Sequence, residues 1–160
     1  MTRPRLRLAA LAAVVLVLAV VVGTLVRAVV SAARTEDATE AAVLAATELT
    51  PVLLGYDWRT LDADVDRIDT ATTGPFAEQN RAIVASLVVP AAIGTRASSS
   101  ATVQRVAVVS AASDRVETLV LYTQTTARAG SPGETVPRSA RVTLRPDDDG
   151  RWLVAGFDAS

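Results

Sequence analysis

Residues 139–157 read SARVTLRPDDDGRWLVAGF and carry the clearest strand signal in the chain. Apolar and polar residues alternate in SARVTLR, which is typical of a strand with one buried face. The Asp-Gly pair at 149–150 indicates a tight hairpin turn, because glycine accepts the positive φ that the turn needs. We therefore predict antiparallel strands at about 139–145 and 151–158, and interpret the three aspartates between them as part of a turn rather than as a metal site.

Two further strands are predicted upstream, at about 101–110 and 116–128. Both segments are rich in valine, threonine and leucine, and their apolar residues recur with a period of two. The segment AGSPGETVPR at 129–138 contains two glycines and two prolines, which favours a loop. The second half of the chain thus predicts an antiparallel meander of about four strands.

The first half of the body has a helical period instead. Helices are predicted at about 35–54, 58–70 and 75–89, with Pro51 expected to kink or end the first and Gly55 to stop it. Their expected core positions are Ala42, Ala45, Leu49, Val52, Leu53, Leu61, Val65, Ile68, Phe76, Ile83, Val84, Leu87 and Val88. Helices followed by a meander predict an α+β domain with the helices packed on one face of the sheet.

The N-terminal segment has an uncharged run of 19 residues, 8–26, preceded by three arginines. A helix of that length spans about 28 Å, close to the thickness of a bilayer core. We expect a cytoplasmic basic flank at 1–7, a single-pass transmembrane helix at 8–30 and an extracytoplasmic domain at 31–160, since arginines hold their side of a span in the cytoplasm. The alternative is a cleaved signal peptide, for which Ser31-Ala32-Ala33 offers a cleavage site.

Composition excludes several function classes. The chain has no cysteine and no histidine, which removes disulfides, thiolate nucleophiles, the commonest general base and the commonest metal ligands. Residues 35–160 carry 17 acidic residues and 11 arginines, a net charge of −6 that gives no electrostatic reason to bind nucleic acid. We expect a protein that is not an enzyme and has no catalytic residues, no metal and no cofactor.

The stretch GYDWRTLDAD at 55–64 concentrates aromatic and acidic residues. We interpret it as a junction between two helices, in which Asp57 or Thr60 caps the second helix and the later aspartates meet its positive end. A calcium loop beginning at Asp62 is excluded, because its sixth and twelfth positions hold arginine and threonine instead of glycine and glutamate.

A pocket or interface is the remaining use for the few large polar and aromatic side chains. The best acid–base set, Tyr56, Asp57 and Tyr122, is interpreted as capping, core or interface residues rather than as an active site. On the last strand, one of two aromatic residues is expected in the core and the other at a surface, if the strand is regular. The candidate pocket or interface residues are Tyr56, Asp57, Trp58, Tyr122, Trp152 and Phe157.

Several motifs together resemble one protein family. They are the basic flank with its apolar run, an alanine-rich helix, LLGYDWRTLDAD, TGPF at 73–76, YTQTT at 122–126, RVTL at 141–144 and DGRWLV at 149–154. In this order and spacing they resemble the actinobacterial Mce-associated membrane proteins. The resemblance implies an NTF2-like (cystatin-like) domain with a cone-like cavity, on a single-pass anchor in the cell membrane.

The resemblance also implies a function. The expected role is that of an accessory subunit that stabilises or assembles an Mce-type lipid or sterol importer. Its expected partners are the lipid bilayer and other importer subunits. The alternative is a domain whose cavity binds, or even transforms, a lipid or steroid, and that alternative requires an open apolar pocket.

Overall fold

The computed structural model describes the backbone of residues 3–160 and the side chains of residue 18, residues 21–27 and residues 29–160. The first element is helix α1 (Arg3–Leu54). The chain divides into two units, residues 1–36 and residues 37–160, and each is described by itself. The elements after α1, together with the last turns of α1, form the second unit, called the domain below.

The prediction of a transmembrane helix at 8–30 is corrected by the structure. Within the described residues, no helix is both long enough and apolar enough to cross a membrane. The described apolar part of α1 is interrupted by Arg27 and Arg34. Residues 1–7 and most of 8–20 lie outside the residues whose side chains are described.

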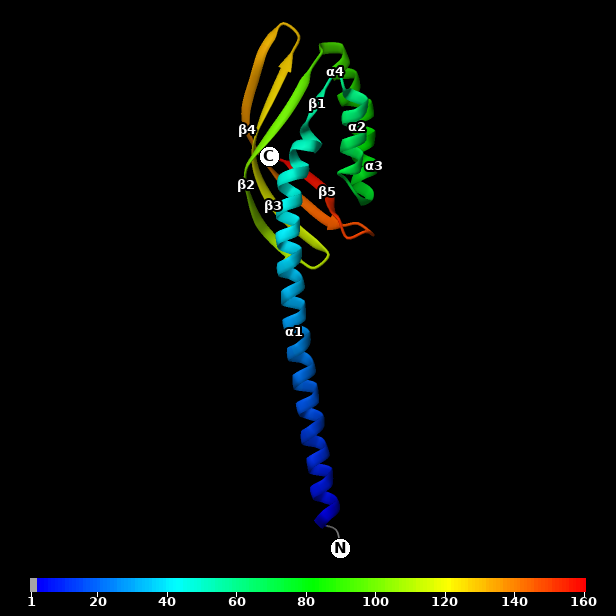
Figure 1. Cartoon of the computed structure of the whole chain (residues 1–160), viewed down its shortest axis with the longest axis vertical. Helices are drawn as coiled ribbons and strands as arrows, with labels where there is room; N and C mark the ends of the chain where they lie inside the picture. Colours follow the sequence, from blue (N-terminus) through cyan, green and yellow to red (C-terminus); the bar gives the residue numbers. More distant parts are fainter. Residues whose placement is uncertain (1–2) are drawn as a thin grey trace. The chain divides into compact units, whose positions relative to one another are not determined.

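The domain contains one antiparallel sheet of five strands in the order β1-β2-β3-β4-β5, each strand paired with the next. The strands are β1 (Tyr56–Asp57), β2 (Ser98–Ala112), β3 (Arg115–Arg128), β4 (Ser131–Pro146) and β5 (Trp152–Ala159). Figure 1 shows them as a curled meander. The α+β class is confirmed, but the expected number of about four strands is wrong. The extra strand, β1, has only two residues and therefore no alternation that the sequence could reveal.

Strand β4 begins eight residues earlier than predicted, in the segment that its glycines and prolines indicated as a loop. Residues 131–138 pair with β3, whereas β5 pairs only with residues 140–146 of β4. The prolines at 132 and 137 therefore lie in a part of β4 with a free edge, where a missing N–H breaks no ladder. The turn before β4 uses Gly130 (φ +77°), and the predicted Asp-Gly turn before β5 uses Gly150 (φ +79°).

The domain has its helices in the three predicted regions, but the third region is longer and is divided into several segments. The helices after α1 are α2 (Leu61–Thr70), α3 (Gly74–Ile83), the π-helical turn η1 (Val84–Val88) and α4 (Val89–Thr95). The region predicted to end at 89 continues to Thr95. The wide turn η1 ends two residues before Pro90, whose ring would collide with the carbonyl of Ser86 in a regular α-helix.

The core lies between α1 and the inner face of the sheet. Ala38, Ala42 and Ala46 of α1 are buried, and their small side chains let the helix approach the strands closely. The sheet contributes Val116, Val120, Tyr122, Ala140, Val142, Leu144 and Val154, several of them fully buried. These side chains fill the interior of the cone.

The third helical region contributes less to the core than predicted. Val84 is buried and Phe76 packs against the core, whereas Ile83 and Leu87 are 43% and 65% exposed. The core expectation for those two residues is wrong. An amphipathic period identifies an apolar stripe, but only the packing decides how much of that stripe is covered.

Strand β5 is not regular. A register shift opposite Thr143 and Leu144 adds one residue, Ala155, to β5. A bulge of this kind reverses the side-chain alternation beyond it. Trp152 and Phe157 therefore both pack against the core instead of facing opposite sides.

Gly55 separates α1 from β1 at a point where space is limited. A Cβ atom at this position would lie 2.7 Å from the carbonyl oxygen of Pro51. We predict that Gly55→Ala lowers the free energy of unfolding by about 2 kcal/mol, because the backbone must shift to relieve the clash. Urea denaturation of the full chain measures this change.

Gly94→Ala is the matched control, since a Cβ atom there meets nothing within 4 Å. It is expected to stabilise the helix by about 0.5 kcal/mol by restricting the unfolded chain. Equal effects of the two substitutions would contradict the steric explanation.

Candidate functional site

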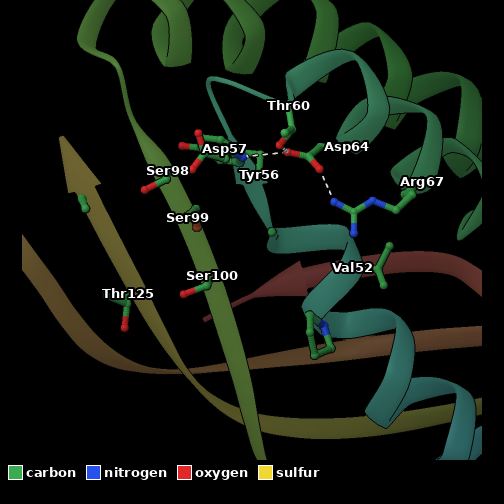
Figure 2. Close-up of a pocket in the computed structure, with 13 residues that line it drawn as sticks. Val52, Tyr56, Asp57, Thr60, Asp64, Arg67, Ser98, Ser99, Ser100 and Thr125 are labelled. Atoms are coloured by element: carbon green, nitrogen blue, oxygen red, sulfur yellow. Dashed lines mark hydrogen bonds and ion pairs between the residues drawn. The ribbon is translucent and has the colours of Figure 1, made fainter. Parts of the chain in front are cut away.

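A cavity of about 500 Å³ lies where the end of α1, strand β1 and helix α2 meet β2 and β3. Its lining residues are Pro51, Val52, Gly55, Tyr56, Asp57, Thr60, Asp64, Arg67, Ser98, Ser99, Ser100, Thr125 and Ala127. Figure 2 shows the labelled members of this set around the GYDWRTLDAD stretch. The junction predicted from the sequence is therefore also one wall of a cavity, which we call the junction cavity.

Asp64 organises the junction cavity. Its side chain is only 2% exposed and accepts hydrogen bonds from the backbone N–H of Asp57 (2.7 Å) and from the hydroxyl of Thr60 (3.0 Å). Its second oxygen accepts a hydrogen bond from the guanidinium of Arg67, and Figure 2 marks these contacts. One carboxylate thus connects β1 to two points of α2.

The same contacts set the protonation of Asp64. Burial by itself would raise the pKa of this carboxyl group. The hydrogen bonds from Asp57, Arg67 and Thr60, with the positive charge of Arg67, outweigh burial and hold the pKa below its ordinary value. Asp64 is therefore ionised near neutral pH, and the charge of Arg67 balances it.

Helix α2 begins without the side-chain cap that the sequence predicted. Thr60 occupies the N-cap position, but its hydroxyl bonds the Asp64 carboxylate instead of a backbone N–H. Asp57 accepts hydrogen bonds from the backbone N–H of Arg59 (2.9 Å) and, at its carbonyl, from that of Thr60 (3.0 Å). Asp57 therefore stabilises the turn before the helix rather than the helix itself.

Trp58 lies beside the junction cavity and is partly exposed. The guanidinium groups of Arg59 and Arg96 lie 4.7 Å and 5.6 Å from its ring centre. Its backbone N–H donates to the carbonyl of Ala97 at 3.2 Å. These contacts hold the loop before α2 to the loop between α4 and β2.

The opposite wall is formed by the start of β2, upstream of the point at which the sequence predicted this strand to begin. Ser98 and Ser99 pair with β1, and Ser99 accepts a hydrogen bond from the side chain of Gln124 at 3.0 Å. In Figure 2 the hydroxyls of Ser98 and Ser100 lie on the same side of the strand. This hydroxyl-rich wall makes the junction cavity polar.

The structure brings together half of the predicted pocket residues. Tyr56 and Asp57 line the junction cavity and Trp58 lies next to it. Tyr122 does not line this cavity, because it is buried in the core with its ring 6.4 Å from that of Phe157. Burial raises the pKa of Tyr122. The acid–base set of Tyr56, Asp57 and Tyr122 therefore does not converge on the junction cavity.

The sequence analysis missed the burial of Asp64, which it expected only to meet the positive end of the helix. A signal was present, because position 64 lies on the same helical stripe as Leu61 and Ile68, and all three are buried. An aspartate on an apolar stripe indicates a buried carboxylate with dedicated donors. The serine wall and Arg67 carried no such signal.

Comparisons with known proteins identify a relative by sequence and similar folds among solved structures. No protein-family model matches the sequence. The chain is 34% identical over 116 residues to the outer membrane protein Rv1973 of Mycobacterium tuberculosis, covering 72% of each chain.

Two solved structures share the NTF2-like fold. An IcmL-like type IV secretion system protein from Legionella pneumophila superposes with a TM-score of 0.63 at 7% identity, over 74% of this chain and 88% of that one. The periplasmic domain of DotI superposes with a TM-score of 0.61 at 9% identity, over 74% and 91%. These similarities establish the fold of the domain.

The bonds around Asp64 predict a pH-dependent contribution to stability. Asp64→Asn is expected to lower the free energy of unfolding by about 2 kcal/mol near pH 7, because three donors lose a charged acceptor. A lowered pKa in the folded state contributes stability above the unfolded pKa and loses it as pH falls through the folded value. The difference between wild type and variant should therefore shrink below about pH 4.

Urea denaturation at neutral and acidic pH measures both effects. Asp62→Asn is the matched control, because Asp62 lies in the same first turn of α2 but is exposed. A control effect as large as that of Asp64→Asn would contradict the role of the buried carboxylate.

Proposed function

Since the chain belongs to the family of the mycobacterial outer membrane protein Rv1973, we propose that it is a non-enzymatic accessory protein of the cell envelope. In this proposal its domain lies outside the cytoplasm. There it stabilises or assembles an Mce-type lipid or sterol import complex through protein contacts.

The filled interior of the domain carries this proposal. Val116, Val120, Val142, Leu144 and Val154 have no exposed surface and occupy the space between α1 and the sheet. A domain filled in this way offers other molecules its outer surfaces rather than a chamber. Contact with partner proteins is the function that such a domain supports best.

The relatives support the location and the kind of assembly. The family member is an outer membrane protein, and the same fold occurs in a periplasmic domain and in a protein of a type IV secretion system. Envelope machines of many subunits therefore use this fold. The Mce assignment itself comes from the sequence motifs.

The alternative of a lipid or steroid pocket has less support. The core side chains occupy the interior that an apolar ligand would need. The junction cavity is lined by Pro51, Val52 and Ala127 together with hydroxyls, two carboxylates and the guanidinium of Arg67. Such a lining does not match a hydrocarbon or sterol skeleton.

Co-purification tests the proposal. A C-terminally tagged full-length chain, extracted from its native envelope with mild detergent, should retain the substrate-binding and membrane subunits of an Mce-type importer. Deleting the gene should lower the amount of assembled importer. Recovery of the chain alone, with a normal importer in its absence, would overturn the proposal.

Two substitutions at neighbouring positions of α1 test whether importer assembly requires the domain to be stably folded. Ala46 is fully buried, so Ala46→Leu is expected to lower stability by about 2 kcal/mol and reduce importer recovery. Thr47 is exposed, so Thr47→Leu should leave recovery unchanged. Equal recovery with both variants, despite a measured loss of stability in the first, would show that assembly does not depend on this domain.

A further inference from the structure

The charges of the domain are distributed unequally between its helices and its sheet. Residues 35–97, which contain the helices, carry ten acidic residues and four arginines, a net charge of −6. Residues 98–160, which form β2 to β5, carry seven of each and are neutral. The helical segment therefore carries carboxylates in excess, whereas the sheet carries acidic residues and arginines in equal number.

The outer face of the sheet has an apolar centre with arginines on a diagonal. Leu119 and Leu121 of β3 are 39% and 42% exposed there, on the face opposite the buried Val120. Arg105 pairs with Leu121 from β2, and Arg141 pairs with Leu119 from β4. We call Arg105, Ala107, Leu119, Leu121 and Arg141 the sheet patch.

The positive charge of the sheet patch is only partly balanced. Arg141 lies 3.7 Å from Glu117, which also pairs with Arg115 at 2.7 Å. Among the described residues, Arg105 takes part in no ion pair. An unpaired guanidinium beside two exposed leucines fits a partner surface that carries both an apolar group and carboxylates.

The same chain presents such a surface on α1. Leu44 is 58% exposed, and Glu40 and Glu48 lie four residues before and after it on the same side of the helix. In the part of the chain that the structure describes, neither glutamate forms an ion pair. We call these three residues the helix stripe.

The two surfaces have matching spacings. Eight residues of helix separate Glu40 from Glu48, a rise of about 12 Å. Arg105 and Arg141 are two strands and two residues apart, which places them about 12 Å from each other along the diagonal. Both surfaces carry leucine between their charged ends. The two glutamates can therefore meet the two arginines while Leu44 packs on Leu119 and Leu121.

We propose that the sheet patch binds the helix stripe of a second copy of this chain. Ala42 and Ala46 of α1 face the inner side of the sheet, so the helix stripe and the sheet patch lie on opposite sides of the domain. Such a contact is head-to-tail and does not close about a two-fold axis. The assemblies should therefore grow with concentration instead of stopping at a dimer. This proposal stands independently of the importer role.

Charge reversal on each surface tests the contact, with sedimentation velocity of the purified full-length chain over a range of concentrations. Wild type should form assemblies that lengthen with concentration and shrink in about 1 M salt, where the screening length falls to about 3 Å. Arg105→Glu/Arg141→Glu and Glu40→Arg/Glu48→Arg should each lose this association. An equal mixture of the two variants should recover it, because every contact in the mixture again joins opposite charges.

Arg128→Glu/Arg138→Glu is the matched control for Arg105→Glu/Arg141→Glu, since both arginines are exposed on β3 and β4 outside the sheet patch and the change in net charge is the same. This control should associate like wild type, and circular dichroism should show all variants folded. A wild type that stays monomeric, variants that associate unchanged, or a mixture of folded variants that does not reassociate would each overturn the proposal.

Discussion

The close approach of α1 to the inner face of the sheet is the constraint on which the rest of the domain depends. Alanines at 38, 42 and 46 make that approach possible, because they place the helix backbone near the strands. The valines and leucine of β3, β4 and β5 then fill the remaining space. A larger residue on this face of α1 would push the helix away from the sheet. The space between helix and sheet would then be wide enough to hold a ligand. With small residues there, the space between α1 and the sheet is filled, and the outer surfaces remain available to partners.

The Asp64 carboxylate plays the corresponding role at the end of the cone. Strand β1 has only two residues and contributes little pairing by itself. The bond from Asp64 to the N–H of Asp57 ties this strand to α2, and the bond to Thr60 fixes the first turn of the helix. Arg67 balances the buried charge, and together with the hydrogen bonds it outweighs the effect of burial, so the carboxylate stays ionised. The polar junction cavity is a consequence of this arrangement, since its walls are the groups that hold the junction together.

The proposed functions follow from the side chains that remain at the surface once α1 has packed on the sheet and Asp64 has joined β1 to α2. Tyr122 is buried in the core and Trp152 and Phe157 are partly buried against it, so these three of the six candidate pocket residues contribute to packing. The exposed leucines on α1 and on β3 remain, together with charges that the domain does not pair internally. These features are the basis on which we propose contacts both with other envelope proteins and with copies of the same chain.

The sequence by itself determined the α+β class, the helical regions, four of the strands and the Asp-Gly turn between the last two, because periodicity and turn chemistry are local properties. It did not determine the two-residue strand β1, the early start of β4 or the bulge in β5, because each depends on a neighbouring strand. In the candidate site it identified the junction with Tyr56, Asp57 and Trp58. Only the tertiary structure decided that Asp64 is buried and that the serines of β2 line the same cavity. A carboxylate reveals its burial only when the chain brings its donors around it.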